Sequence, residues 1–148
     1  MRVIVVRVQR AICKVDGITT GQIEKGFLLL VGFKNGDDSL VLPKMVKKVS
    51  GLRIFEDENN KLNKGLKEVN GDILSISQFT LYADMKNGNR PSFTNAMPGS
   101  MAKLLYDEFN KNLEDLGFKV EKGIFGADMK LEYINDGPCT IILDSDCL

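Results

Sequence analysis

The chain has 148 residues, with 20 basic and 20 acidic side chains and therefore no formal net charge. This length suits one domain with a sizeable core, spanning residues 1–148, and the balanced charge excludes a protein that attracts polyanions through its overall field. Histidine is absent, which excludes Ser-His-Asp triads, Cys-His pairs and histidine zinc sites.

The start of the chain predicts a strand with one arginine on its apolar face. Residues 2–8 are rich in β-branched side chains, and a period of two places Arg7 on the same face as Val3 and Val5. By the residues alone, Arg7 is interpreted as a strand-end side chain that extends to water. The alternative is a paired arginine that holds another segment in position.

The next segments alternate between strand and helix patterns. Residues 11–21 predict a second strand and a turn, and the apolar run at residues 27–33 predicts a central strand. Residues 38–51 predict a helix that ends at Gly51. Its apolar side is formed by Leu42, Met45, Val46 and Val49. Its lysines are interpreted as a solvated face, with a contact to backbone phosphate left open.

The second half of the chain contains the clearest helix pattern. Residues 72–82 predict a strand in which polar side chains enter an apolar face, and Ser100 is predicted to cap a helix that ends at Gly117. The apolar stripe of this helix consists of Met101, Leu104, Leu105, Phe109, Leu113 and Leu116. Three further strands separated by turns are expected at residues 118–125, 128–134 and 139–145.

Many strands with two inserted helices predict an α+β domain with a largely antiparallel, curved or barrel-like sheet. Arg2 and Arg7 interrupt the apolar start and no small-residue cleavage site follows, so neither a signal peptide nor a membrane span is expected. The three cysteines lack CxxC spacing, which favours reduced thiols and a cytoplasmic protein.

The residues by themselves do not define a catalytic centre. Hydroxyl groups at positions such as Ser77 and Thr80 have no histidine to activate them. Cys139 lies among apolar neighbours and is interpreted as a small core residue. No phosphate loop, metal-ligand cluster or paired-carboxylate motif occurs, so neither a metal nor a cofactor is expected. Two polar stretches remain unusual, at residues 77–82 and 135–140.

Those two stretches belong to a set of motifs that closely resembles the D-aminoacyl-tRNA deacylases. The motifs are SQFTLYAD at residues 77–84, RPSF at 90–93, FGADM at 125–129 and NDGPCTIILDS at 135–145. Residues 1–8 and 51–58 are also similar, so the resemblance covers essentially the whole chain. One departure is Cys139, where the family usually has Val; because a thiol is a small hydrophobe, this change should disturb packing little.

The resemblance implies a homodimer that hydrolyses the ester between a D-amino acid, or glycine, and the 3′-terminal adenosine of tRNA. Such an ester is already activated, so the enzyme needs to position the ester, a water and the neighbouring ribose 2′-hydroxyl. A strong nucleophile, a metal and a cofactor are then unnecessary. The absence of histidine is compatible with this chemistry.

The resemblance also assigns residues. It implies that the reaction centre is lined, largely by main-chain groups, by Ser77, Gln78, Phe79 and Thr80. It implies that the pocket is completed by Gly137 and Pro138 of the other subunit, joined by a cis peptide bond whose turn excludes L side chains. It implies that Phe125 and Gly126 face the terminal adenosine. The supporting residues are Arg7, which would steady the Gly-Pro segment, and Thr140.

Two alternatives belong to other classes of protein. The chain could be a non-catalytic nucleic-acid-binding dimer of the same fold, or a purely structural dimer built by strand pairing. Retention of both the SQFT and the GP motifs argues against each of them.

Overall fold

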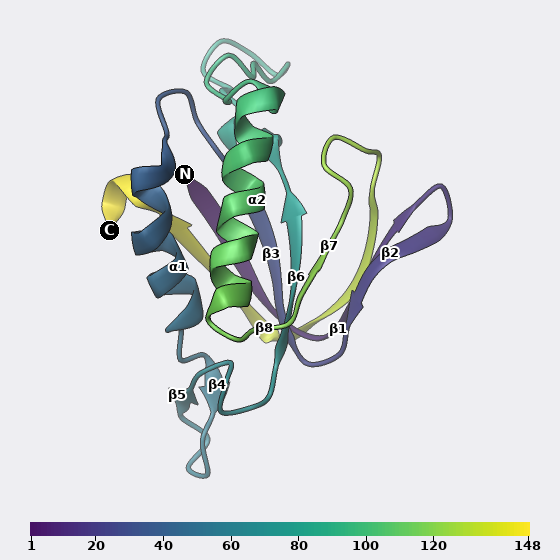
Figure 1. Ribbon diagram of the computed structural model, residues 1–148, viewed down its shortest axis with the longest axis vertical. Helices are drawn as coiled ribbons and strands as arrows, with labels where there is room; N and C mark the ends of the chain where they lie inside the picture. Colours follow the sequence, from purple (N-terminus) through teal and green to yellow (C-terminus); the bar gives the residue numbers. More distant parts are fainter.

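The computed structural model describes residues 1–148 and contains a six-stranded mixed sheet, a small hairpin and two α-helices (Figure 1). The strands are β1 (Arg2–Val15), β2 (Ile18–Ile23), β3 (Gly26–Gly32), β4 (Phe55–Glu56), β5 (Leu62–Lys64), β6 (Asp72–Ser77), β7 (Val120–Lys122) and β8 (Lys130–Asp144). The helices are α1 (Leu42–Ser50) and α2 (Gly99–Asp115), with 3-10 turns η1 (Ser39–Val41), η2 (Phe79–Tyr82) and η3 (Ser145–Cys147). Neither helix has the length and apolar character that a membrane crossing requires.

The long strand β1 organises the sheet. It pairs antiparallel with β3 through residues 2–8, with β2 through residues 11–15, and with β8 along most of its length. The pairs β3–β6 and β6–β7 are parallel, which the sequence did not indicate. The strands form a nearly closed barrel-like sheet, so the predicted α+β class and barrel-like, largely antiparallel sheet are confirmed.

The core lies on both faces of β3, which explains the continuous apolar run in this strand. Phe27 and Leu29 join the cluster between the sheet and the two helices, whereas Leu28 joins a second cluster on the other face. Both helices lie side by side over the first cluster (Figure 1). The prediction that residues 27–33 form a central strand is therefore confirmed.

The helix α1 follows its sequence pattern closely. Its buried side chains are the predicted set, Leu42, Met45, Val46 and Val49. The helix begins later than predicted because residues 39–41 form the turn η1, which is capped by Asp38, whose carboxylate accepts the Leu40 N–H at 2.9 Å. Gly51 ends the helix with a φ of −95°, so it is not a left-handed cap.

The helix α2 corrects two predictions. It begins at Gly99 without a side-chain cap, so Ser100 is not its cap. Its buried face is formed by Ala102, Tyr106, Phe109, Asn110 and Leu113. The predicted stripe is partly wrong, because Met101 is 57% exposed and Leu104 is 70% exposed. The sheet selects a face that includes small and polar side chains, which a count of apolar residues does not detect.

Three predicted strand boundaries are also wrong. The segment 72–82 is a strand only as far as Ser77. The Gln78 N–H still donates to the Val31 carbonyl of β3 at 2.7 Å, and the chain then turns into η2. Residues 118–125 contribute only the short strand β7. The two strands predicted at 128–134 and 139–145 are one strand, β8, which runs through the Asn-Asp-Gly-Pro stretch without a chain-reversing turn.

Candidate active site

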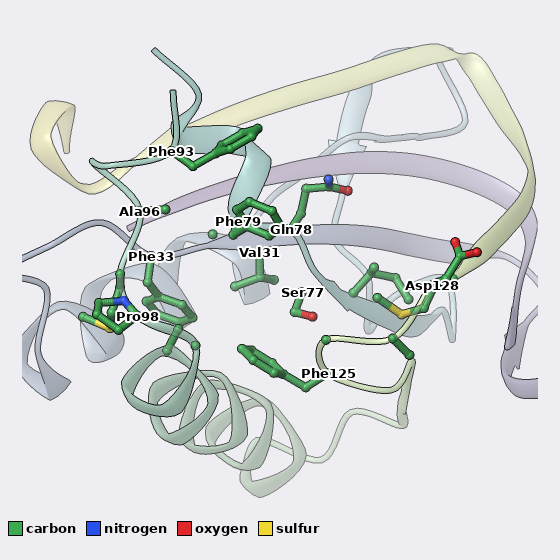
Figure 2. A pocket seen from close by; sticks show the side chains of 18 of the residues that line it. Val31, Phe33, Ser77, Gln78, Phe79, Phe93, Ala96, Pro98, Phe125 and Asp128 are labelled. Atoms are coloured by element: carbon green, nitrogen blue, oxygen red, sulfur yellow. The ribbon is translucent and has the colours of Figure 1, made fainter. Parts of the chain in front are cut away.

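A cavity of about 590 Å³ opens between the end of β6, the start of α2 and the segment that follows β7 (Figure 2). Five residues of the predicted site line it: Ser77, Gln78, Phe79, Phe125 and Gly126. Other lining residues were assigned no role from the sequence, among them Phe33, Phe93, Pro98 and Met129. Figure 2 shows Ser77 between Phe79 on one side and Phe125 on the other.

The cavity exists because β7 leaves β6 before β6 ends. Pairing between the two strands stops at Ser75 and Lys122, whereas β6 continues to Ser77. Beyond this fork, the exposed edge of β6 faces the residues after Gly123 instead of a neighbouring strand. The fork therefore places Ser77 at the floor of the cavity.

A glycine in β3 allows the segment that follows Ser77 to fold closely over the sheet. A Cβ atom on Gly32 would lie 2.8 Å from the Gln78 carbonyl oxygen and 3.2 Å from the Leu81 Cβ. Only glycine permits this approach without displacing the backbone of Gln78. Gly32 is thus a site residue that the sequence did not single out.

The side chains after Ser77 form the rim of the cavity. The Phe79 ring is 57% exposed and contacts Phe93 edge to face, with ring centroids 4.9 Å apart. The Gln78 side-chain amide donates to the Thr80 hydroxyl. Thr80 is exposed and does not line the cavity, so it contacts the site through Gln78.

The cavity contains few ionisable groups. Asp128 is the one titratable side chain in its lining, and its carboxylate is paired with Lys130 at 2.8 Å. No lysine or arginine is among the residues that line the cavity with Ser77. The lining is otherwise apolar side chains, backbone and amide groups, which suits positioning and polar stabilisation of a substrate better than proton transfer by a side chain.

The Asn-Asp-Gly-Pro stretch forms a bulge in β8. On the two sides of the bulge, Val6 pairs with Thr140 and Val8 pairs with Asn135, so Arg7 alone lies opposite residues 136–139. A β-bulge bends the strand and redirects its backbone. The Gly137-Pro138 peptide bond is cis, and Gly137 has a φ of +124°. The turn-forming residues therefore shape a bulge, not a chain reversal.

Arg7 holds this bulge from inside the protein. Its side chain is buried, its Nε donates to the Asp136 carbonyl at 2.9 Å, and its Nη1 donates to the Ile54 carbonyl at 2.6 Å. The interpretation of Arg7 as a side chain that extends to water is wrong. The paired arginine is correct, and it links the bulge to the segment before β4.

Asn135 holds the other side of the bulge, although no role was predicted for it. Its Oδ1 accepts the Cys139 N–H at 3.0 Å, and its Nδ2 donates to the Thr140 hydroxyl at 3.0 Å. The supporting position predicted for Thr140 is therefore a contact to Asn135. The tendency of Asn side chains to bind nearby backbone is the signal that could have identified this residue.

The two parts of the predicted site are separate within one chain. Gly137 and Pro138 do not line the cavity that contains Ser77 and Phe125. Both sets of residues are held by specific contacts, but a single chain does not bring them together.

Comparison with known proteins identifies the class of enzyme. The family model described as D-Tyr-tRNA(Tyr) deacylase matches residues 4–144. D-aminoacyl-tRNA deacylase from Lactobacillus acidophilus is 59% identical, covering 97% of this chain and 99% of that protein. The enzyme of the same name from Listeria innocua is 50% identical, with 99% and 97% coverage. The chain is thus a hydrolase that acts on the aminoacyl-tRNA ester bond.

Solved structures share the fold of this chain. A structure titled c-Myc DNA Unwinding Element Binding Protein has a TM-score of 0.91 and 37% identity, covering 97% of this chain and 98% of that one. A probable eukaryotic D-amino acid tRNA deacylase shares the fold, with a TM-score of 0.83, 18% identity and coverage of 96% and 97%. The chain belongs to the D-Tyr-tRNA(Tyr) deacylase family.

Proposed function

We propose that residues 1–148 act as one chiral-proofreading domain that removes D-amino acids, and glycine, from the 3′ end of tRNA in the cytoplasm. The observation that carries this proposal is the cavity that gathers Ser77, Gln78 and Phe79 with Phe125 and Gly126. In this proposal the terminal adenosine lies against Phe125 and Gly126, and the ester lies near the backbone of residues 77–80. Catalysis consists of positioning the ester, a water and the ribose 2′-hydroxyl.

Selection of the D-ester requires a second subunit. Because Gly137 and Pro138 lie outside the cavity of their own chain, we assign them to the cavity of a partner in a homodimer. Their backbone would lie against the α-amino group of the substrate. An L side chain would collide with this backbone, whereas a D side chain would point outward, so selection works by exclusion.

The role of Thr80 can be tested by removing its hydroxyl. Thr80→Ala is expected to lower the rate of D-ester hydrolysis by no more than about tenfold, because it removes one hydrogen bond to the Gln78 amide. Loss of a nucleophile in a hydrolase costs about a million-fold. Single-turnover hydrolysis of one D-aminoacyl-tRNA distinguishes these cases, and a covalent adduct trapped on Thr80 would contradict the positioning role.

A second candidate function is nucleic-acid binding without catalysis. It is favoured by the name of one structural relative, the c-Myc DNA Unwinding Element Binding Protein. One experiment distinguishes hydrolysis from binding without catalysis. The protein is incubated with D-aminoacyl-tRNA and, separately, with a DNA duplex. We expect ester loss with catalytic turnover. Binding of DNA or tRNA with the ester intact would support the binding function instead.

A further inference from the structure

A buried tyrosine in α2 lies under the fork that opens the cavity. The Tyr106 side chain is buried, and its hydroxyl donates to the Ser75 carbonyl oxygen at 2.7 Å. The same carbonyl accepts the Gly123 N–H at 3.3 Å. Ser75 is the last residue of β6 that pairs with β7, and Gly123 is the first residue beyond β7. One carbonyl therefore joins α2, β6 and the segment that leaves the sheet.

The ring of Tyr106 contacts Phe125, which forms part of the cavity wall. Its centroid lies 5.8 Å from that of Phe125 at an interplanar angle of 50°. Phe125 lines the cavity, and its ring also lies near the start of α2, where a Cβ atom on Gly99 would be 3.8 Å from the Phe125 Cε1. The hydroxyl of Tyr106 thus contacts the strand that leads to Ser77, while its ring supports the aromatic wall.

The surroundings keep the phenol neutral. Burial raises the pKa of Tyr106, so the hydroxyl stays protonated and remains a donor at neutral pH. Asn110 lies one helical turn further along the same face and is buried beside the phenol. A buried polar group is costly for stability unless it is hydrogen-bonded, and the Tyr106 hydroxyl has the Ser75 carbonyl as its partner.

We propose that Tyr106 is a positioning residue for the reaction, which fixes the separation between the segment 77–80 and the Phe125 wall. It does not touch the reacting atoms, and its effect passes through the Ser75 carbonyl and the Phe125 ring. This inference rests on the proposed roles of Ser77 and Phe125. It predicts that the hydroxyl and the ring of Tyr106 control different kinetic constants.

The test compares Tyr106→Phe with Tyr106→Leu on one D-aminoacyl-tRNA. Tyr106→Phe keeps the ring and loses the hydrogen bond, so kcat is expected to fall about tenfold while KM stays within about twofold. Tyr106→Leu also removes the support of Phe125, so KM is expected to rise as well. The value of kcat is expressed per folded enzyme, and thermal unfolding is recorded for each variant.

The matched control is Tyr82→Phe. Tyr82 is also buried, but its hydroxyl has no hydrogen-bond partner, so its loss is expected to leave kcat and KM unchanged. If Tyr106→Phe unfolds at a lower temperature yet keeps the wild-type kcat and KM, its role is only structural and the inference is overturned. Should Tyr106→Leu fail to fold, Tyr106→Phe alone decides between these outcomes. An inactive wild-type enzyme would overturn the proposed function and this inference with it.

Discussion

Gly137→Ala is expected to fold but to lose about 100-fold in the rate of D-aminoacyl-tRNA hydrolysis. A Cβ at this position would lie 2.6 Å from Nη2 of Arg7, and the backbone has a φ of +124°, which L residues rarely adopt. The bulge must therefore shift away from the arginine that holds it. The strain is expected to cost about 1–3 kcal/mol of stability. The measurement pairs dimer mass by light scattering with hydrolysis of one D-ester.

Gly36→Ala is the matched control for this variant. Gly36 also has a left-handed backbone, with a φ of +86°, but a Cβ there meets no atom within 4 Å. It should reproduce the loss of stability without the loss of activity. A dimeric Gly137→Ala that keeps normal D-ester turnover would show that the bulge has no part in the active site.

Arg7→Met is expected to lower the free energy of unfolding by about 3 kcal/mol or more. The methionine keeps much of the side-chain length but leaves the Asp136 and Ile54 carbonyls without their donor. Since the bulge is then held mainly by Asn135, the backbone that is proposed to exclude L side chains should also become mobile. The ratio of D-ester to L-ester hydrolysis is expected to fall. Denaturant unfolding and paired hydrolysis rates measure the two effects.

Arg10→Met provides the comparison on the same strand. Arg10 is exposed and has no ion pair, so its replacement should change stability by no more than about 0.5 kcal/mol. Its D-to-L ratio should equal that of the wild type. If Arg7→Met matched Arg10→Met in both measurements, the contacts of Arg7 to the bulge would have no energetic importance.

Local sequence patterns correctly predicted the buried face of a helix where that face packs against a single core cluster. The buried face of α1 was predicted correctly because its apolar residues lie at helical spacing over a single core cluster. The prediction of the buried face of α2 was partly wrong, because this helix has more apolar residues than its contact with the sheet can cover. Leu104 remains exposed, whereas Tyr106 and Asn110 are buried.

The bulge shows what local patterns do not contain. Asn, Asp, Gly and Pro favour tight turns, but here they occur inside one strand, because β1 pairs with β8 on both sides of them. That pairing joins residues more than 100 positions apart, so no short window of sequence reveals it. The buried position of Arg7 follows from the same pairing.

The candidate site was predicted by resemblance more than by chemistry. The motifs singled out Ser77, Gln78, Phe79, Phe125 and Gly126, which the structure gathers around one cavity. Residue types alone indicated no catalytic centre, because the chain has no histidine to activate a hydroxyl. Gly32 and Tyr106 were missed since their importance lies in close approach and long-range contact, neither of which leaves a local signal.

The most direct test of selection by exclusion is hydrolysis of matched D- and L-aminoacyl-tRNA. The same tRNA is charged with the two enantiomers of one amino acid, and ester loss is followed with catalytic amounts of the wild-type enzyme. The Gly137-Pro138 backbone is proposed to block the L side chain and to leave the D side chain free. The D-ester should therefore be hydrolysed while the L-ester survives. Equal rates for the two enantiomers would contradict the account.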